Sequence, residues 1–491
     1  MTGGSTPGSM EPLRLALSRY LPSQDILIQP EELRPFESDG LTAYRQVPGL
    51  VVLPETEQQV QAILRTCHEF NVPVVARGHG TGLSGGALPH GQGVLLSLAR
   101  LNSILFLDPL ARTARVQPGV RNLAISDAAA ASGLYYAPDP SSQIACSIGG
   151  NVAENSGGVH CLKYGLTVHN VLRVRMVTLE GEILELGSEA LDSPGYDLLA
   201  LVTGSEGLLG VVTEVTVRLL PRPVTARAIL AAFDDVEKAG AAVARIIAQG
   251  IIPAGLEMMD GPAIRAAEAF VKAGYPVTAE ALLICESDGT PEEVESEMGR
   301  LRALLDDSGA LETRLSVNEA ERLKFWAGRK AAFPAVGRLA PDYYCIDGTI
   351  PRRSLGQVLK RIYALSHEYG QEVCNVFHAG DGNLHPLILF DASKPGELEQ
   401  TEAFAARILE LCVEVGGTIT GEHGVGVEKI DQMCVQFGVN ELHAFHGIKS
   451  VFDPSGLLNP GKAIPLLHRC AELGRMHVHH NHVPHPELPR F

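Results

Sequence analysis

The chain has 491 residues, of which 45% are hydrophobic and 20% are charged, and its formal net charge is −17 at pH 7. This length and balance are typical of a globular enzyme with two or more domains. The negative charge argues against nucleic acid or an anionic lipid surface as a partner. No stretch reaches the length of a membrane span, and no apolar leader precedes the first predicted elements. We therefore expect a cytoplasmic protein, attached at most to the inner face of the plasma membrane through a partner.

The nine cysteines are scattered along the chain, and no two of them form a Cys-x-x-Cys pair. Such a distribution is typical of buried thiols in a reducing compartment. It gives no support for an iron–sulfur cluster within this chain.

The first half of the chain is expected to mix strands, helices and long glycine loops. Thr56 begins a capping box that opens a helix, with Val60 and Ile63 on its apolar face. A buried strand over residues 72–76 runs into the glycine-rich segment 77–86. A helix is expected over 122–132. Further short strands are expected over 94–98, 104–107, 114–116, 172–179 and 210–220. This mixture indicates an α+β fold.

A domain boundary is expected at Pro221-Arg-Pro223. Beyond it, strands alternate with helices, which indicates a separate α/β layer domain. The expected strands cover 229–233 and 282–286, and the expected helices cover 236–249, 291–308 and 318–330. We divide the chain into an N-terminal segment 1–48, a first domain 49–222, an α/β domain 223–425 and a C-terminal helical segment 426–491. The histidine-rich stretch 477–485 is expected to be a solvated or partner-facing tail rather than a metal site.

Two glycine-framed segments near the end of the second domain carry candidate metal ligands. His378 and His385 lie in the first segment, and Glu422 and His423 lie in the second. Two imidazoles and a carboxylate suit a divalent transition metal and leave coordination positions for a substrate. His423 is then available as a proton acceptor. The alternative interpretation is that these residues are ordinary loop histidines beside a solvated glutamate. The surrounding glycines favour a binding site instead, because they allow the backbone to approach a ligand closely.

A possible phosphate-binding loop follows the first buried strand. Gly80-x-Gly82-x-x-Gly85 formally matches the dinucleotide fingerprint, which must open a helix. Pro89 and further glycines follow, and they cannot sustain such a helix. A run of glycines with Ser and Thr can still hold phosphate oxygens through backbone N–H groups.

At this point the sequence resembles a known family. Residues 73–87 resemble the pyrophosphate loop of the FAD domain of vanillyl-alcohol oxidase and p-cresol methylhydroxylase (the PCMH type). Residues 136–142, 149–158 and 203–213 resemble its other FAD-contacting segments. The histidine segments resemble those of the D-lactate and D-2-hydroxyglutarate dehydrogenases. From residue 25 onward the likeness is greatest to the catalytic subunits of bacterial glycolate oxidases. The resemblance implies a PCMH-type FAD-binding domain and an α/β cap domain that carries the metal site.

The resemblance also implies which residues contact FAD. The glycine loop would wrap the diphosphate, two middle segments would line the ribityl chain and flavin ring, and the closing segment with Lys462 would return to the FAD domain. Because the position that carries a covalent flavin in some relatives is Thr81 here, with His79 displaced from it, we expect non-covalent FAD. The implied contacts are Arg77, Gly78, His79, Gly80, Thr81, Gly82, Leu83, Ser84, Gly85, Pro138, Asp139, Ser141, Ser142, Gly149, Gly150, Asn151, Asn155, Gly157, Gly158, Glu206, Gly207, Gly210, Val211 and Asn459.

A candidate substrate anchor lies on the helix expected over 318–330. Trp326 and Arg329 are three residues apart and so face the same way. Without the family resemblance, this pair would be interpreted as a core tryptophan beside a surface arginine. Arg329, however, resembles the family arginine that holds a substrate carboxylate through two parallel hydrogen bonds. The D-2-hydroxyglutarate dehydrogenases carry a lysine where this chain has Cys345, which favours a short monocarboxylate.

The function implied by the resemblance is FAD-dependent oxidation of a short 2-hydroxy acid. Glycolate is the first candidate, giving glyoxylate, and D-lactate is the alternative. His378, His385 and Glu422 would hold Zn, Mn or Fe, His423 would take the hydroxyl proton, and Arg329 would anchor the carboxylate. Electrons would pass to an external acceptor, through a second flavin-type subunit and an iron–sulfur subunit. A flavin-free metallohydrolase and a non-enzymatic flavin-carrying subunit are the other readings.

Overall fold

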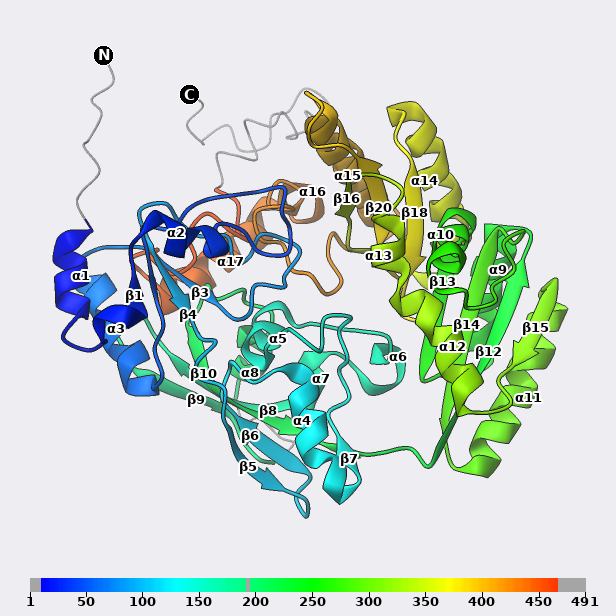
Figure 1. Cartoon of the computed structure of the whole chain (residues 1–491), viewed down its shortest axis with the longest axis horizontal. Helices are drawn as coiled ribbons and strands as arrows, with labels where there is room; N and C mark the ends of the chain where they lie inside the picture. The colour runs from blue at the N-terminus through cyan, green and yellow to red at the C-terminus, as the bar shows by residue number, and fades with distance from the viewer. Residues whose placement is uncertain (1–9, 191–194, 467–491) are drawn as a thin grey trace.

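The computed structural model describes residues 10–190 and 195–466, so the histidine-rich stretch 477–485 lies outside the described residues. Figure 1 shows two halves: the N-terminal part of the chain and the closing helices on one side, and the cap domain with its large sheet on the other. Among the described residues, no helix combines the length and the apolar character that crossing a membrane requires.

The first sheet carries the glycine-rich loop at the end of strand β3. Its order is β1-β2-β4-β3, and β2, β4 and β3 are parallel. The predicted capping box is confirmed, since Thr56 Oγ1 accepts a hydrogen bond from Gln59 N at 3.2 Å. β3 begins at Val74 rather than at residue 72, because Val72 N donates to Cys67 O and proline follows. The elements are α1 (Glu11–Leu17), β1 (Ile26–Leu27), α2 (Pro30–Leu33), β2 (Leu50–Val52), α3 (Glu57–Glu69), β3 (Val74–Arg77) and β4 (Val94–Ser97).

The second sheet of the first domain is antiparallel, in the order β5-β6-β10-β8-β9. The predicted strands are confirmed with shifts at their ends, and the last residues of the helix predicted over 122–132 form a 3₁₀ turn that ends at Gly133. β7 and β11 form a separate two-stranded antiparallel sheet. The elements of this part of the chain are β5 (Ile104–Asp108), β6 (Thr113–Val116), α4 (Asn122–Ala129), β7 (Leu134–Tyr135), α5 (Ile148–Glu154), α6 (Cys161–Tyr164), α7 (Thr167–Asn170), β8 (Val171–Val177), β9 (Ile183–Gly187), α8 (Leu198–Val202), β10 (Val211–Arg218) and β11 (Leu220–Pro221).

The cap domain is a seven-stranded sheet between two helical layers. Its order is β15-β12-β14-β13-β18-β20-β16, and every neighbouring pair is antiparallel although strands and helices alternate along the chain. Alternate residues of β12 enter two different cores, as the two-residue period of a strand requires. The strands are β12 (Thr225–Phe233), β13 (Gly255–Asp260), β14 (Ala281–Gly289), β15 (Glu312–Leu315), β16 (Asp342–Cys345), β18 (Val373–Phe377) and β20 (Pro386–Phe390).

Seven helices accompany this sheet. α9, α11, α14 and α15 supply residues to one core, and α10, α12 and α13 supply residues to the other. Each face of the sheet is therefore covered, which explains why these strands read as continuous apolar runs. The helices are α9 (Val236–Ala248), α10 (Gly261–Val271), α11 (Pro291–Asp307), α12 (Glu319–Lys330), α13 (Ala332–Val336), α14 (Leu355–Tyr369) and α15 (Glu397–Glu414).

The closing segment returns to the first domain. After α16 (Met433–Gln436) and α17 (Val439–Phe452), Leu458 forms a parallel bridge with Val74 of β3. Val74 N donates to Leu457 O, and Asn459 N donates to Val74 O, both at 2.8 Å. The end of the described chain thus extends the sheet that carries the glycine loop.

Candidate active site

A single cavity joins the glycine-rich loop of the first domain to residues of the cap domain. Arg329 of α12 and Phe333 of α13 lie on its cap side, together with His385, Glu422 and His423. The predicted FAD contacts that line it are Arg77, Gly78, His79, Gly80, Thr81, Gly82, Leu83, Ser141, Ser142, Gly149, Gly150, Asn151, Glu206, Gly207, Gly210 and Val211. The two sets of predicted residues therefore face the same space.

The glycines of this cavity have the positions that a cofactor cradle requires. A Cβ added at Gly82, Gly150 or Gly207 would meet no protein atom closer than 3.3 Å, so a side chain there would project into the cavity. Gly80 has φ +69°, and a Cβ there would lie 2.1 Å from Nη2 of Arg77, whose guanidinium is folded beneath the loop. Without side chains at these glycines, a ligand in the cavity can approach the backbone closely. This geometry fits the diphosphate and ring of FAD.

Several predicted FAD contacts lie outside this cavity and support its wall instead. Asp139 Oδ2 binds Nδ1 of His160 at 2.7 Å. Asn459 Nδ2 donates to the carbonyl oxygens of Gly86 and Glu206, at 3.0 and 2.6 Å. Direct contact at these positions is implied by the resemblance of their segments to the FAD-contacting segments of the family, whereas the carboxylate of Asp139 and the amide of Asn459 bind protein groups in this structure. The positions outside the cavity are Ser84, Gly85, Pro138, Asp139, Asn155, Gly157, Gly158 and Asn459.

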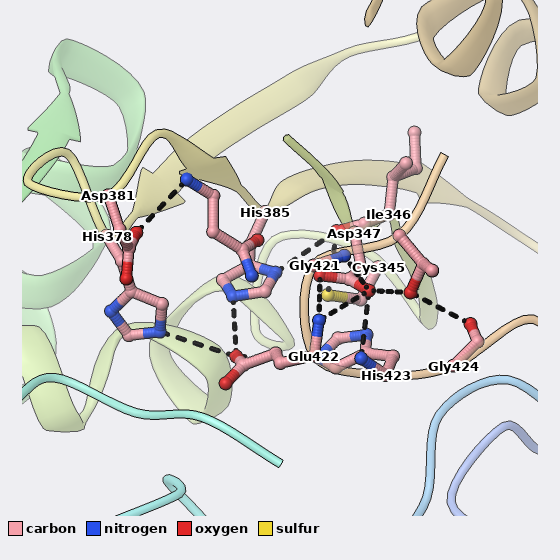
Figure 2. A network of polar contacts seen from close by, with 12 residues as sticks. Cys345, Ile346, Asp347, His378, Asp381, His385, Gly421, Glu422, His423 and Gly424 are labelled. Atoms are coloured by element: carbon pink, nitrogen blue, oxygen red, sulfur yellow. Dashed lines mark hydrogen bonds and ion pairs between the residues drawn. The ribbon is translucent and has the colours of Figure 1, made fainter. Parts of the chain in front are cut away.

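The three predicted metal ligands converge on one point (Figure 2). His378 and His385 flank β19 (Asn383–Leu384), which pairs with β17 (Gly348–Thr349). Glu422 Oε1 lies 3.0 Å from Nε2 of His385 and 3.4 Å from Nε2 of His378. These atoms are close enough to one another for a single ion to bind all three.

The other ring nitrogen of each histidine is already occupied. Nδ1 of His385 lies 3.2 Å from Ile346 O, so it must be the donor. Nδ1 of His378 lies 2.8 Å from Oε1 of Glu257, a carboxylate with no exposed surface. Both Nε2 atoms are therefore directed at Glu422, which is the arrangement that metal-binding histidines show in proteins.

The charges around His378 favour a cation at this point. Burial lowers the pKa of His378, but the carboxylates of Glu257 and Glu422 outweigh it and raise the pKa well above its ordinary value. Burial raises the pKa of Glu422, but hydrogen bonds from His378 and His385 outweigh it and hold the pKa well below its ordinary value. A divalent ion bound by Glu422 and by Nε2 of His378 would place positive charge near the same two carboxylates. The donor set therefore fits such an ion.

Asp347 holds the loop that carries Glu422 and His423. Its Oδ2 accepts hydrogen bonds from Thr420 Oγ1 at 2.6 Å, Gly421 N at 3.0 Å and His423 N at 2.9 Å. Lys429 Nζ, also fully buried, lies 3.4 Å from the same oxygen. A carboxylate that accepts several backbone N–H groups fixes the loop's conformation, and Figure 2 shows these bonds converging on it.

His423 is placed beside the ligand cluster without belonging to it. Its ring stacks on that of His385, with centroids 4.9 Å apart and an interplanar angle of 11°. Nε2 lies 3.9 Å from Glu422 Oε1, and Nδ1 is buried without a hydrogen-bond partner among the described residues. Burial lowers the pKa of His423 to about 4, so the ring is neutral at pH 7 and can accept a proton.

Arg329 lines the cavity with part of its guanidinium uncommitted. Its Nε donates to Glu257 Oε2 at 2.8 Å. Nη2 is also 2.8 Å from that oxygen but is not aligned for a hydrogen bond with it or with any other described acceptor. Only 3% of the side chain is exposed. An arginine with spare donors at the edge of a cavity can bind a carboxylate.

Two supporting residues, Glu257 and Asp347, were not predicted from the sequence. Glu257 lies on β13 in the apolar run Leu256-Glu-Met-Met259, where a lone charged residue on a doubly covered strand indicates a buried partner. Asp347 lies two residues after the end of β16 (Asp342–Cys345). Its interaction with the loop at residues 420–423 has no local signature, because the two segments are far apart in the sequence.

Comparison with known proteins assigns the class. Residues 48–187 match the family described as "FAD binding domain", and residues 222–463 match "FAD linked oxidases, C-terminal domain". The chain belongs to the FAD-linked oxidases, and it is therefore an oxidoreductase with an FAD-binding domain. This assignment removes the flavin-free metallohydrolase and the non-enzymatic subunit from the alternatives.

The relatives narrow the class further. Over 477 residues the chain is 65% identical to "Glycolate oxidase subunit GlcD" of Escherichia coli (strain K12), covering 97% of this chain and 96% of the relative. It is 40% identical over 428 residues to the protein of the same name from Bacillus subtilis (strain 168), covering 87% and 91%. It is 32% identical over 447 residues to a D-lactate dehydrogenase of Anaerostipes hadrus, covering 89% and 94%.

Solved structures support the predicted fold. p-Cresol methylhydroxylase with substrate bound superposes with a TM-score of 0.79 at 16% identity, covering 95% of this chain and 98% of that one. 4-Ethylphenol oxidase from Gulosibacter chungangensis gives 0.78 at 16% identity, covering 95% and 99%. At this level of identity the likeness concerns the fold alone, and it confirms the PCMH-type architecture.

Proposed function

We propose that this chain oxidises glycolate to glyoxylate by hydride transfer to FAD, with D-lactate as the alternative substrate of the same chemistry. The observation that carries the proposal is the meeting of the glycine cradle, His385, Glu422, His423 and Arg329 around one cavity. The full-length identity to proteins named as glycolate oxidase subunits points to the same substrate.

Two side chains have separate roles: Arg329 binds the substrate carboxylate and His423 accepts the hydroxyl proton. Arg329 binds the substrate carboxylate through its uncommitted donors, since Nε is already held by Glu257. With the carboxylate fixed there, the hydroxyl group lies toward Glu422 and His423 at the same wall. Neutral His423 accepts the hydroxyl proton, and a positioned base of this kind contributes about 10²- to 10⁴-fold to the rate.

Two groups complete the site when bound. FAD, held by the glycine cradle, supplies the hydride acceptor. A divalent ion, held by Nε2 of His378, Nε2 of His385 and the Glu422 carboxylate, lowers the pKa of the substrate hydroxyl. The ion would be Zn, Mn or Fe, because two imidazoles beside one carboxylate suit these transition-metal ions better than Mg or Ca. FAD is bound without a covalent link, since Thr81 offers no ring nitrogen at the attachment position.

A short acid fits the cap side of the cavity. Cys345 replaces the lysine that would bind a distal carboxylate, and it is buried with its Sγ 3.6 Å from Ile346 O. Arg329 is then the one cationic group of the cap domain among the described residues that line this cavity. A second carboxylate on the substrate would have no partner and would be desolvated at a cost.

The electrons of the reduced flavin pass to an external acceptor. Two of the relatives are named as subunits, which supports a multi-subunit enzyme. We infer a second flavin-type subunit and an iron–sulfur subunit as partners, with the assembly in the cytoplasm at the inner face of the plasma membrane.

Anaerobic mixing tests the proposal. The purified protein, together with its partner subunits if they co-purify, is mixed with glycolate, D-lactate, L-lactate and D-2-hydroxyglutarate while flavin absorbance is followed. Rapid bleaching by glycolate is expected, with slower bleaching by D-lactate. A flavin that none of these acids bleaches would refute the function, and faster bleaching by D-2-hydroxyglutarate would refute the argument from Cys345.

A further inference from the structure

We propose that Glu257 is a positioning residue that orients two groups of the site at once, the metal ligand His378 and the carboxylate anchor Arg329. The inference rests on the proposed function, because it gives these two residues their roles there. Its content is new: the metal affinity and the carboxylate affinity of the site depend on the same buried carboxylate.

The geometry divides the two oxygens of Glu257 between two partners. Oε1 lies 2.8 Å from Nδ1 of His378, and Oε2 accepts from Nε of Arg329 at 2.8 Å. None of the Glu257 side chain is exposed, and the two partners are 4% and 3% exposed. Water therefore cannot replace either contact, and the loss of the carboxylate leaves both donors without an acceptor.

The strand register explains why Glu257 reaches both groups. β13 pairs with β18 so that Met258 faces Phe377, and Gly380 N donates to Leu256 O at 2.9 Å. Glu257 is thereby placed beside His378, the residue that follows β18. On the other side, α12 contributes Arg329. The strand thus joins the metal-binding segment to the substrate-binding helix.

Glu257 leaves free the donor and acceptor atoms that the reaction uses. Because Nδ1 of His378 is occupied, its Nε2 faces Glu422 at 3.4 Å. Nη2 of Arg329 lies 2.8 Å from the same Oε2 of Glu257 but makes no hydrogen bond in the part of the chain that the structure describes, so its donor capacity is unused. Replacing the carboxylate would let both side chains rotate, so both affinities would fall together.

Glu257→Gln tests the inference, with Glu286→Gln as the matched control. Glu286 is a buried glutamate of the neighbouring strand β14, and it binds Trp326 and Arg322 of the same helix α12 without contacting His378. Zn²⁺ affinity is measured by chelator competition in substrate-free protein. Acetate affinity is measured in metal-free holoprotein from the perturbation of the flavin spectrum.

Glu257→Gln is expected to weaken Zn²⁺ binding by about 10- to 100-fold and to weaken acetate binding as well, whereas Glu286→Gln leaves both unchanged. Glu257→Asp keeps the buried charge but is one methylene short, so it should fold and still lose part of both affinities. Parental affinities in Glu257→Gln, or the loss of only one of the two, would overturn the inference. These titrations decide on Glu257 even if no 2-hydroxy acid reduces the parental flavin.

Discussion

The glycine cradle and the histidine–glutamate centre are built in opposite ways. The loop of the cradle is the contiguous segment 77–86 at the end of a parallel strand, and Gly150 and Gly207 complete the cradle from two further segments. The centre joins segments that are far apart, since Glu257 and His378 are separated by 121 residues and Asp347 and His423 by 76. A cofactor loop of the first kind is encoded locally, whereas the second kind exists only after the cap sheet has formed. The two regions should therefore respond differently to mutation.

The largest effect is expected at the centre, for His385→Ala. The variant should lose bound metal, because the remaining His378 and Glu422 make too small a donor set. Flavin reduction should slow by about 10³-fold or more, since a metal that polarises the hydroxyl contributes several kcal/mol. Elemental analysis and stopped-flow absorbance measure the two quantities. His367→Ala on the exposed side of α14 is the control, and full metal content in His385→Ala would exclude it as a ligand.

His423→Ala separates proton transfer from metal binding. Its ring stacks on His385, and it lies outside the proposed ligand group of His378, His385 and Glu422, although with Cys345 and His385 it forms a second group of possible ligands. We expect bound FAD and metal to stay at the parental level while flavin reduction slows by about 10²- to 10⁴-fold. Metal analysis and single-turnover bleaching give the answer, and an unchanged bleaching rate would remove His423 from the role of base.

Much of the fold, and the convergence of His378, His385 and Glu422, could be predicted, because the segments that carry them have local signals. The capping box at Thr56 opens α3, and the apolar runs mark β12 and β14 where they were expected. His378, His385 and Glu422 were identified from their glycine-rich segments, and the structure brings their side chains together.

The residues that hold the site residues in place, such as Glu257, could not be predicted from local sequence signals. Glu257 meets His378 only through the pairing of β13 with β18, and sequence patterns do not specify which distant strands become neighbours. Asp139 was assigned to the cofactor because segment 136–142 resembles an FAD-contacting segment of the family, but its carboxylate binds His160. Residues that are adjacent in the sequence can point to opposite sides of the cavity wall. A segment that contacts the cofactor can therefore contain residues that do not.

The cradle itself is tested by Gly82→Val. A Cβ there would meet only Asp39 Oδ2, at 4.0 Å, so the apoprotein should fold normally. The larger side chain projects into the cavity and should weaken FAD binding, by about 10- to 100-fold if one to three kcal/mol of contact is lost. Titration of the apoprotein with FAD measures the affinity, and the melting temperature of the apoprotein checks that it folds normally. Gly299→Ala on α11, where an added Cβ also meets open space, is the control and should bind FAD normally. Normal FAD affinity in Gly82→Val would place the cofactor elsewhere.

The smallest effect is expected for Thr56→Ala, which acts on the helix beneath the cradle. Thr56 Oγ1 accepts from Gln59 N, and Gln59 Oε1 accepts from Thr56 N, each at 3.2 Å. Loss of an N-cap side chain costs about 1 kcal/mol of stability. Denaturant unfolding should show this loss, while flavin content, metal content and bleaching by glycolate stay parental. Loss of metal in this variant would mean that the first domain shapes the histidine–glutamate centre, and the division between a locally encoded cradle and a centre assembled within the cap would then be wrong.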